Sequence, residues 1–313
     1  MGLTIGVDIG GTKIAAGVVD EQGKILTRTR RSTPSRDLDA VVAIVNDAIS
    51  ELAARHRVDA VGVGTAGFID SGRSRVLLAP NLGWTDAPLR LLIERTTGLT
   101  AVIENDANAA AWGEARFGAG RGGTNVVAIT VGTGIGGGLI LNGALYRGQH
   151  GMAAEVGHLC VQPGGRSCGC GLRGCWEQYG SGNALVRAAR ELAADNRDQA
   201  RILLEFGDGT PEGVQGAHVT DAAQQGDKVA LQAFAITGSW LGRGMADLAA
   251  VLDPEAFVIG GGVSEAGDLL FVPTRASFLE HLTGRDQRVP PTLRLAELGN
   301  DAGIVGAADL ARQ

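Results

Sequence analysis

A short strand, a glycine-rich loop and a second strand follow one another near the start of the chain, and the same succession occurs near its middle. In the first copy, β-forming residues between positions 3 and 19 lie on both sides of Asp8–Thr12. In the second copy, residues 126–141 enclose Gly132–Gly138, and the turn-forming pair Asn142-Gly143 comes next. Because strands joined by such turns pair as hairpins, we predict a hairpin in each half and a weak internal repeat.

The second loop, Gly132-Thr133-Gly134-Ile135-Gly136-Gly137, has the glycine spacing of a dinucleotide-binding fingerprint. That fingerprint requires a helix directly after its last glycine. Here we expect a returning strand from Leu139 to Leu141, and no Gly-Lys-Ser/Thr follows, which also excludes a Walker A loop. What remains is a hairpin whose backbone amides can surround an anion, or a hairpin with a purely structural role.

The first loop adds a carboxylate, Asp8, directly beside the unhindered amides of Gly10 and Gly11. Two loops of this kind favour binding of a polyphosphate, and Asp8 is placed to hold Mg²⁺ next to it. The alternative for Asp8 is an aspartate that caps a turn.

Helical and extended patterns alternate along the chain, which is typical of an α/β protein. Its 313 residues suggest two domains, and no apolar run is long enough to cross a membrane. Gly118–Gly123 is a plausible linker. We predict helices at 38–55, 87–97, 107–117 and 229–252, and further strands at 60–63, 100–103 and 256–259.

The charge balance argues against some partners. The chain has 28 basic and 34 acidic side chains and a net charge of −6, which disfavours nucleic acid and anionic membrane surfaces. The first residues have neither a basic start nor an apolar stretch typical of a secretory signal. We therefore expect a cytoplasmic protein.

All four cysteines lie between positions 160 and 175, which favours a metal site over a disulfide framework. His158, Cys168, Cys170 and Cys175 form a complete tetrahedral zinc set, and glycines between them let a short loop surround the ion. Such a closed site is structural. We expect Cys160 to be a small packed side chain, and the competing interpretation of a zinc-ribbon nucleic-acid module is disfavoured by the acidic charge.

Several carboxylates lie near these motifs. Asp106 follows a predicted strand and precedes a predicted helix, where open α/β sheets bind ligands, although helix capping is the alternative. Glu155 and Glu177 flank the predicted zinc ligands, so the metal would hold both in one region. Together with Asn105, these acceptors suit a polyhydroxylated ligand.

With these motifs in place, the chain resembles the ROK family of sugar kinases and sugar-responsive repressors, in the actin-like ATPase superfamily. The resemblance covers nearly the whole chain and rests on Asp8–Thr12, Glu104–Asn108, Val131–Gly138, Glu155–His158 with the cysteines and Glu177, and Gly260–Gly262. Regulators of the family usually carry an N-terminal helix-turn-helix, for which there is no room before Asp8. Within the kinases, Ala153–His158 is most similar to bacterial glucokinases.

The resemblance implies two actin-like (ribonuclease-H-like) α/β domains with a cleft between them. We expect the first at 1–118 and the second at 119–301, with a helix at 302–313 that packs back on the first. Asp106 would be the catalytic base. The sugar hydroxyls would be held by Gly67, Asn105, Asp106, Glu155, His158 and Glu177. The nucleotide and Mg²⁺ would lie against Asp8, Gly10, Gly11, Thr12, Gly132, Thr133, Gly134, Gly136, Gly137 and Gly261.

The implied activity is ATP-dependent phosphorylation of glucose at the 6-hydroxyl, with ATP and Mg²⁺ as cofactors and Zn²⁺ in a structural role. The alternatives are a kinase for N-acetylmannosamine or another hexose, and a sugar sensor without activity. Polyphosphate as the phosphoryl donor stays open. We also expect a homo-oligomer, without nucleic-acid or membrane partners.

Overall fold

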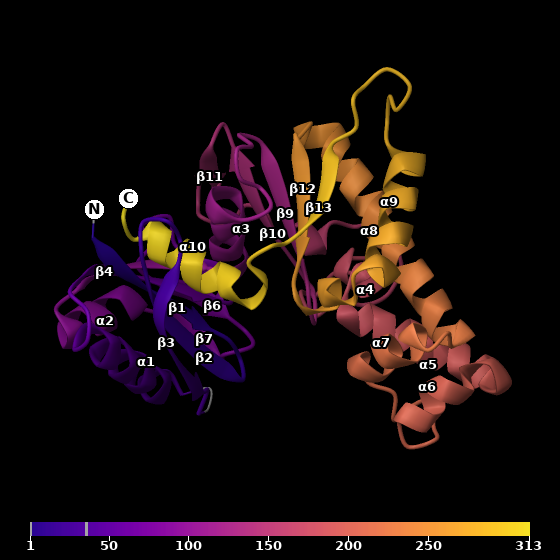
Figure 1. Cartoon of the computed structure of the whole chain (residues 1–313), viewed down its shortest axis with the longest axis horizontal. Helices are drawn as coiled ribbons and strands as arrows, with labels where there is room; N and C mark the ends of the chain where they lie inside the picture. The colour runs from indigo at the N-terminus through magenta and orange to yellow at the C-terminus, as the bar shows by residue number, and fades with distance from the viewer. Residues whose placement is uncertain (1, 35–36) are drawn as a thin grey trace. The chain divides into compact units, whose positions relative to one another are not determined.

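The chain forms two compact units in a computed structural model, which describes residues 2–34 and 37–313 (Figure 1). The chain passes between the units four times, within β9 (Val126–Val131), within β10 (Ile135–Leu141), after Ala154 and after Leu295. This division differs from the expected boundary at residue 118, which stays a prediction. Unit 1 contains Met1–Ala128, Gly137–Ala154 and Ala296–Gln313, and unit 2 contains Ile129–Gly136 and Glu155–Leu295.

Unit 1 is built on a five-stranded sheet with the order β3-β2-β1-β4-β8. β1, β2 and β3 pair antiparallel, so the predicted first hairpin is confirmed, whereas β4 runs parallel to β1 and β8 parallel to β4. The parallel arrangement brings the carboxyl ends of β1, β4 and β8 to one edge. The strands are β1 (Leu3–Ile9), β2 (Lys13–Val19), β3 (Ile25–Ser32), β4 (Val58–Thr65) and β8 (Thr100–Asn105).

Helix α1 (Leu38–Ala53) packs against α2 (Leu89–Thr97) and the sheet, and its apolar stripe, which includes Val41, Val45 and Ile49, is buried in the core of unit 1. We expected α2 to begin at Ala87, but Ala87 ends a strand and Pro88 precedes the helix. Proline disfavours helical geometry in the residue before it. The small second sheet of this unit has the order β5-β6-β7, formed by Phe68–Ile69, Val76–Ala79 and Trp84–Ala87.

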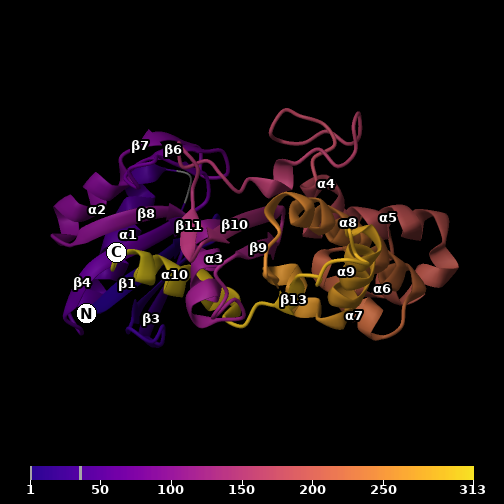
Figure 2. The same ribbon diagram turned by 90° about the horizontal axis from the view of Figure 1, so that it is seen from above.

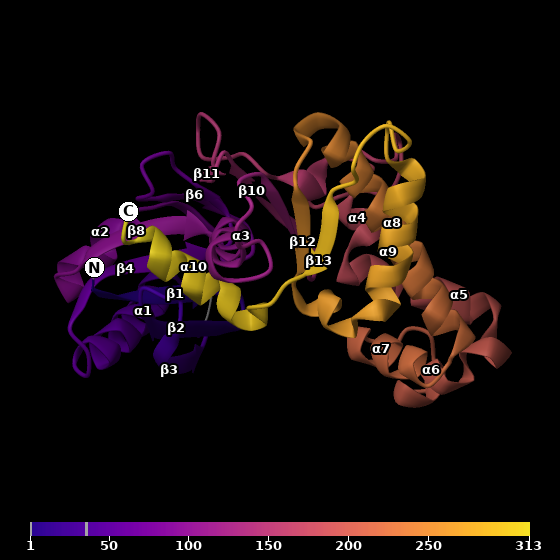
Figure 3. The ribbon, with the colours of Figure 1, turned by 45° about the horizontal axis from the view of Figure 1, so that its top comes forward.

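Helix α10 (Ala302–Leu310) packs on β1 and β4 and on α3 (Asp106–Phe117), as Figure 3 shows. Glycines make this packing unusually close. A Cβ atom on Gly6 or Gly62 would lie 1.9 or 1.7 Å from a backbone oxygen of α10, and one on Gly306 would lie 1.7 Å from a backbone oxygen of α3. Any side chain at these positions would push the helix away, so part of the glycine content serves packing rather than ligands.

The second five-stranded sheet has the order β11-β10-β9-β12-β13, which matches the first sheet strand for strand. The predicted internal repeat is therefore visible in the topology. The strand β10 begins at Ile135, four residues earlier than we expected, so the glycines from Gly136 to Gly138 belong to a strand. The strands are β9 (Val126–Val131), β10 (Ile135–Leu141), β11 (Ala144–Tyr146), β12 (Ala256–Gly260) and β13 (Thr292–Leu295).

Unit 2 adds a layer of helices to its part of this sheet. The long helix α8 lies beside α9 (Figure 1), and Gly242 lets the two backbones approach, since a Cβ there would lie 2.4 Å from Thr274 O. Among the described helices, none combines the length and the apolar composition that a membrane crossing requires. The helices are α4 (Glu177–Gly180), α5 (Gly182–Asp195), α6 (Arg201–Phe206), α7 (Gly216–Gln224), α8 (Lys228–Leu252) and α9 (Asp268–His281), with short 3₁₀ turns at Val156–His158, Arg197–Ala200 and Gly262–Ala266.

Candidate active site

The first glycine loop joins β1 to β2 in a tight turn. The amide of Gly10 donates to Lys13 O at 2.9 Å, and the hydroxyl of Thr33 donates to Gly10 O at 2.7 Å, so the loop backbone is held from two sides. Gly11 and Thr12 are exposed, and a Cβ at Gly11 would meet nothing within 4 Å. The loop therefore offers open space beside its amides, as an anion site requires.

The turn between β8 and α3 carries the predicted base. The side chain of Asn105 accepts the amide of Asn108 at 3.0 Å and so caps α3. Asp106 is the first helical residue, and its Oδ1 accepts the amide of Ala107 at 2.9 Å. Asn105 is therefore the N-cap of α3, the role that was the alternative interpretation of Asp106. The amide group of Asn105 also donates to Gly67 O at 3.2 Å, which brings three predicted sugar-binding residues together.

Asp8 and Asp106 are electrostatically coupled within unit 1. Burial, together with the negative charge of Asp106, raises the pKa of Asp8 to about 6, against the opposing charge of Lys13. Burial also raises the pKa of Asp106, against the hydrogen bond from Ala107. Gly303 of α10 lies next to Asp8, since a Cβ there would be in van der Waals contact with the carboxyl carbon at 3.5 Å. Two carboxylates in one partly buried place favour a cation or a proton between them.

The second glycine loop is shorter than we expected. Only Gly132–Gly134 lie between the strands, and the amide of Gly132 donates to Gly134 O at 3.0 Å. Gly136 and Gly137, which we placed in the loop, belong to β10, and Gly137 is buried. Glycine recurs along this strand for a packing reason, since a Cβ on Gly138 would lie 2.3 Å from Ala111 Cβ. Thr133 is exposed at the tip of the loop.

His158, Cys168, Cys170 and Cys175 converge in unit 2, with their ligand atoms all within 4.8 Å of one another. The Nδ1 atom of His158 lies 3.7 Å from the Cys168 sulfur, and the Cys170 and Cys175 sulfurs lie 3.6 Å apart. A tetrahedral ion with zinc–sulfur bonds of about 2.3 Å places its ligands about 3.8 Å apart, so the group fits zinc. Figure 2 shows the loop that carries these cysteines before α4.

The chemistry of the thiols also fits a metal. Burial raises the pKa of Cys168 to about 12, so without a cation this sulfur stays protonated and is a poor nucleophile. Cys160 lies outside the group. It is exposed, with its sulfur 3.6 Å from Arg173 O at the surface, so our expectation of a small packed side chain is wrong.

The predicted sugar-binding residues of unit 2 surround this metal group. Glu177 accepts the Cys168 thiol at 3.0 Å, and its other oxygen faces Gly134, where a Cβ would lie 2.5 Å away. His158 turns Nδ1 toward the sulfurs, which leaves Nε2 on the other side of its ring. Glu155 is exposed one residue before the turn Val156–His158. The structure thus gathers His158, Glu177 and the second glycine loop in one place.

Gly261 follows β12 with a φ of +86°, a conformation that favours glycine. A Cβ at this position would lie 2.6 Å from Val131 O of β9, so the strand end requires glycine for packing alone. The predicted contact of Gly261 with a nucleotide stays a prediction. Its neighbour Gly262 is exposed, with nothing within 4 Å of a Cβ.

A family model described as the ROK family matches residues 4–313 of this chain. The chain belongs to the ROK family. It is 51% identical over 313 residues to a glucokinase of Streptomyces coelicolor, a match that covers 100% of this chain and 98% of the relative. An N-acetylmannosamine kinase of Yersinia pseudotuberculosis is 35% identical, with 100% and 99% covered.

Among solved structures, the chain is similar to a ROK family glucokinase from Streptomyces griseus in complex with glucose and AMPPNP. The TM-score is 0.91, the identity is 52%, and the match covers 100% of both chains. The predicted fold class, two actin-like α/β domains, is confirmed by this similarity and by the matching strand orders of the two sheets.

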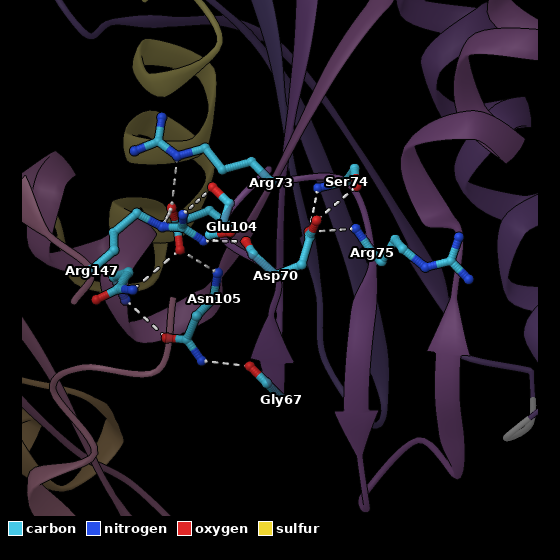
Figure 4. A network of polar contacts seen from close by, with 10 residues as sticks. Gly67, Asp70, Arg73, Ser74, Arg75, Glu104, Asn105 and Arg147 are labelled. Carbon is cyan, nitrogen blue, oxygen red and sulfur yellow. Dashed lines mark hydrogen bonds and ion pairs between the residues drawn. The ribbon is translucent and has the colours of Figure 1, made fainter. Parts of the chain in front are cut away.

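This ROK protein also contains polar residues near Asp106 that we did not predict. Buried Glu104 accepts the Asn105 amide at 2.9 Å and the Asn108 side chain at 3.1 Å. Arg147 and Arg73 both turn toward it (Figure 4), with their Nε atoms 2.8 and 3.3 Å from Glu104 Oε2. The only signal in the sequence is a carboxylate inside the Glu104–Asn108 motif, since its arginine partners are far away along the chain.

Proposed function

We propose that this ROK protein transfers the γ-phosphoryl group of ATP to the 6-hydroxyl of glucose. The observation that carries the proposal is full-length similarity, at 52% identity and a TM-score of 0.91, to a kinase solved with glucose and an ATP analogue. The geometry supports it because an acid–base carboxylate, two glycine loops and a structural metal group occur in one chain.

Asp106 acts as the general base. Its carboxylate takes the proton of the 6-hydroxyl while the hydroxyl oxygen bonds to the γ-phosphorus, and the bond from phosphorus to the β,γ-bridging oxygen breaks to release ADP. The amide of Ala107 donates to Oδ1 and so fixes the orientation of the carboxylate. Burial raises the pKa of Asp106 above its usual range, which makes it a stronger base.

Asp8 would hold Mg²⁺, directly or through water, and Mg²⁺ when bound neutralises charge on the phosphates. The residues fit the ion, because Asp8 is a partly buried carboxylate whose pKa is raised by burial and by the charge of Asp106, and a cation relieves both effects. The amides of Gly10, Gly11 and Thr12, and those of Gly132–Gly134, would orient the phosphates.

Gly67, Asn105 and Asp106 would bind hydroxyls of the sugar, as would Glu155, His158 and Glu177. Zn²⁺ held by His158 and the three cysteines would be structural, and His158, with Nδ1 toward the cysteines, would present Nε2 to the substrate. A carboxylate and an imidazole accept or donate as each hydroxyl requires.

A coupled assay for ADP release over a panel of sugars tests the proposal. We expect glucose with ATP to give the highest kcat/KM, and no ADP release with any sugar would refute a kinase and favour a sensor. N-acetylmannosamine is the second candidate substrate, because an N-acetylmannosamine kinase is 35% identical over the full chain. Replacing ATP by polyphosphate, with formation of glucose 6-phosphate as the measured signal, decides the donor.

We further propose that the protein acts in the cytoplasm as a homo-oligomer, without nucleic-acid or membrane partners. Its substrate ATP and its reduced cysteine ligands are typical of that compartment. Light scattering of the purified chain measures the mass in solution, and a monomer at all concentrations would contradict the assembly.

A further inference from the structure

Arg147 is attached to unit 1 by three sets of contacts around one guanidinium. Its Nη1 and Nη2 atoms donate to Ser71 O at 3.1 Å and Asp70 O at 2.9 Å, and its Nε lies 2.8 Å from Glu104 Oε2. The side chain is 11% exposed and that of Glu104 is 1% exposed. A planar guanidinium makes several such contacts at once, which lysine cannot do.

The contact between Glu104 and Arg147 is electrostatic. Neither Glu104 Oε2 nor Arg147 Nε has a partner in hydrogen-bond geometry among the described residues. Buried ion pairs of this kind contribute little net stability, because desolvation of both charges offsets their attraction. A reason other than stability is therefore needed for two arginines around one buried carboxylate.

The other carboxylate oxygen of Glu104, Oε1, contacts the turn that carries Asp106. Oε1 accepts the amide of Asn105 and the side chain of Asn108, so the carboxylate fixes the turn that starts α3. Asn105 in turn donates to Gly67 O. The Glu104 carboxylate thus orients the backbone of Asp106. It also orients Asn105 and, through it, Gly67, the two other proposed sugar-binding residues of unit 1.

Arg147 also begins the segment that leads to the sugar residues of unit 2. Residues 147–154 are the last part of unit 1 before the chain passes to Glu155. The amide of Ala153 donates to Arg147 O at 3.1 Å, and Gly151 packs so closely that a Cβ there would lie 2.3 Å from Ile69 O. Ala154 then has a φ of +70°, which is unusual for alanine and indicates a constrained backbone at the crossing.

We propose that Arg147, acting through Glu104, is a positioning residue that holds the turn of Asp106 and residues 147–154 of unit 1 in the geometry needed for sugar phosphorylation. This inference rests on the proposed function. It predicts a defect in the use of sugar and not in the use of ATP, because none of these contacts involves the loop Asp8–Lys13.

The chain offers a matched control in Arg312. This arginine is 7% exposed, pairs with Asp309 at 3.1 Å, and donates through Nη2 to Val19 O and Asp20 O at 2.6 and 2.9 Å. It therefore repeats the contacts of Arg147, in the same unit, without touching a proposed substrate residue. Arg312→Met measures what the loss of such a pair does to folding alone.

The experiment compares Arg147→Met with Arg312→Met by steady-state kinetics and thermal unfolding. We expect kcat/KM for glucose to fall by roughly 10- to 100-fold in Arg147→Met, since misplacement of about 1 Å has this effect, while KM for ATP changes less than about twofold. Arg312→Met should lower Tm to a similar extent and keep the wild-type kinetics. Equal sugar kinetics in the two variants would overturn the inference.

Two further variants keep the test decisive. Arg147→Lys serves if Arg147→Met does not fold, and we expect an intermediate loss in kcat/KM for glucose, whereas wild-type values would overturn the inference. In Glu104→Gln, adding Arg147→Met should lower kcat/KM little further, because both act through one pair; losses that multiply would contradict this. If the wild type releases no ADP with any sugar, the proposed function has failed, whereas an active wild type isolates the test of Arg147.

Discussion

The turn from Glu104 to Asn108 and the cysteine loop from His158 to Cys175 are both small polar structures beside proposed substrate residues, but they are held in different ways. The turn is stabilised by partners far away in the sequence, among them Gly67 and Arg147. The loop depends on four ligands within eighteen residues, with exposed side chains around them. One is thus held by the packing of unit 1, and the other by a metal.

The two regions should therefore respond differently to substitution. The turn is inseparable from a buried core, so a substitution there changes geometry while the fold persists. The loop buries few apolar side chains, so its order depends on zinc, whose binding free energy is also folding free energy. We therefore expect substitutions in the turn to lower activity while the fold is retained, and loss of zinc to disorder the cysteine loop.

The largest effect is expected from Asp106→Asn, which removes the base without disturbing the turn. Asparagine has the size of aspartate and keeps an acceptor for the Ala107 amide. We expect kcat to fall by roughly 10²- to 10⁴-fold with glucose binding retained. Stopped assays give kcat and calorimetry gives the glucose Kd; near-wild-type kcat would remove Asp106 from the role of base.

Loss of zinc should affect the cysteine loop, the second of the two regions. In Cys168→Ser, we expect bound zinc to fall from about one ion per chain to a small fraction. Activity should then fall by roughly 10- to 100-fold because His158 and Glu177 lose their support. Metal analysis and limited proteolysis of the loop report the two effects.

Cys160→Ser is the matched control for the zinc site. Cys160 is an exposed cysteine in the same loop but lies outside the ligand group. We expect full zinc content and wild-type activity in this variant. Full activity of Cys168→Ser without zinc would show that the loop needs no metal.

Asp8, at the first glycine loop, and the cysteine loop should respond oppositely to pH. The folded pKa of Asp8 is about 6 against an ordinary value of 3.8, so the folded state binds more protons between these values and the unfolding free energy falls as pH rises through this window. Asp8→Asn removes this pH-dependent loss of unfolding free energy, because asparagine does not titrate. In Mg²⁺-free buffer we expect the variant to be more stable than the wild type at pH 8 by about 2–3 kcal/mol, with no difference near pH 3.

The zinc loop should show the reverse trend, because acid protonates the imidazole and thiolate ligands and releases the metal. Urea unfolding at several pH values measures the Asp8 effect, and zinc content along the same series measures the loop. A constant stability difference between Asp8→Asn and wild type across the range would contradict the assigned pKa.

The smallest effect is expected at the other end of α3. Buried Glu114 accepts the amides of Ala119, Glu297 and Leu298, and so holds the chain where it re-enters unit 1. Glu114→Gln loses part of this capacity, and we expect the unfolding free energy to fall by about 1–3 kcal/mol. The kinetic constants should not change, since no proposed substrate residue is touched; a selective rise in KM for glucose would show that Glu114 also acts on the site.

Much of the fold could be predicted, because it is encoded in local patterns. The hairpin of β1 and β2 and the helix α1 follow from periodicity and turn residues. The start of β10 was misplaced because glycines at 136–138 suggested a loop, whereas they lie in a strand in which Gly138 packs closely against Ala111 of α3. Cys160 was misplaced because burial depends on neighbours that the sequence around it does not specify.

The sequence by itself determined the metal group, because four ligands with fixed spacing and interleaved glycines can close on one ion without help from the rest of the chain. It also determined the succession of strands and loops that the two sheets share. Only the tertiary structure decided which charges surround Glu104, the residue two before Asp106, since Arg73 and Arg147 are distant from it along the chain. It also decided what many glycines are for: at Gly6, Gly62 and Gly306, backbone replaces side chain so that α10 can lie directly on the sheet and on α3.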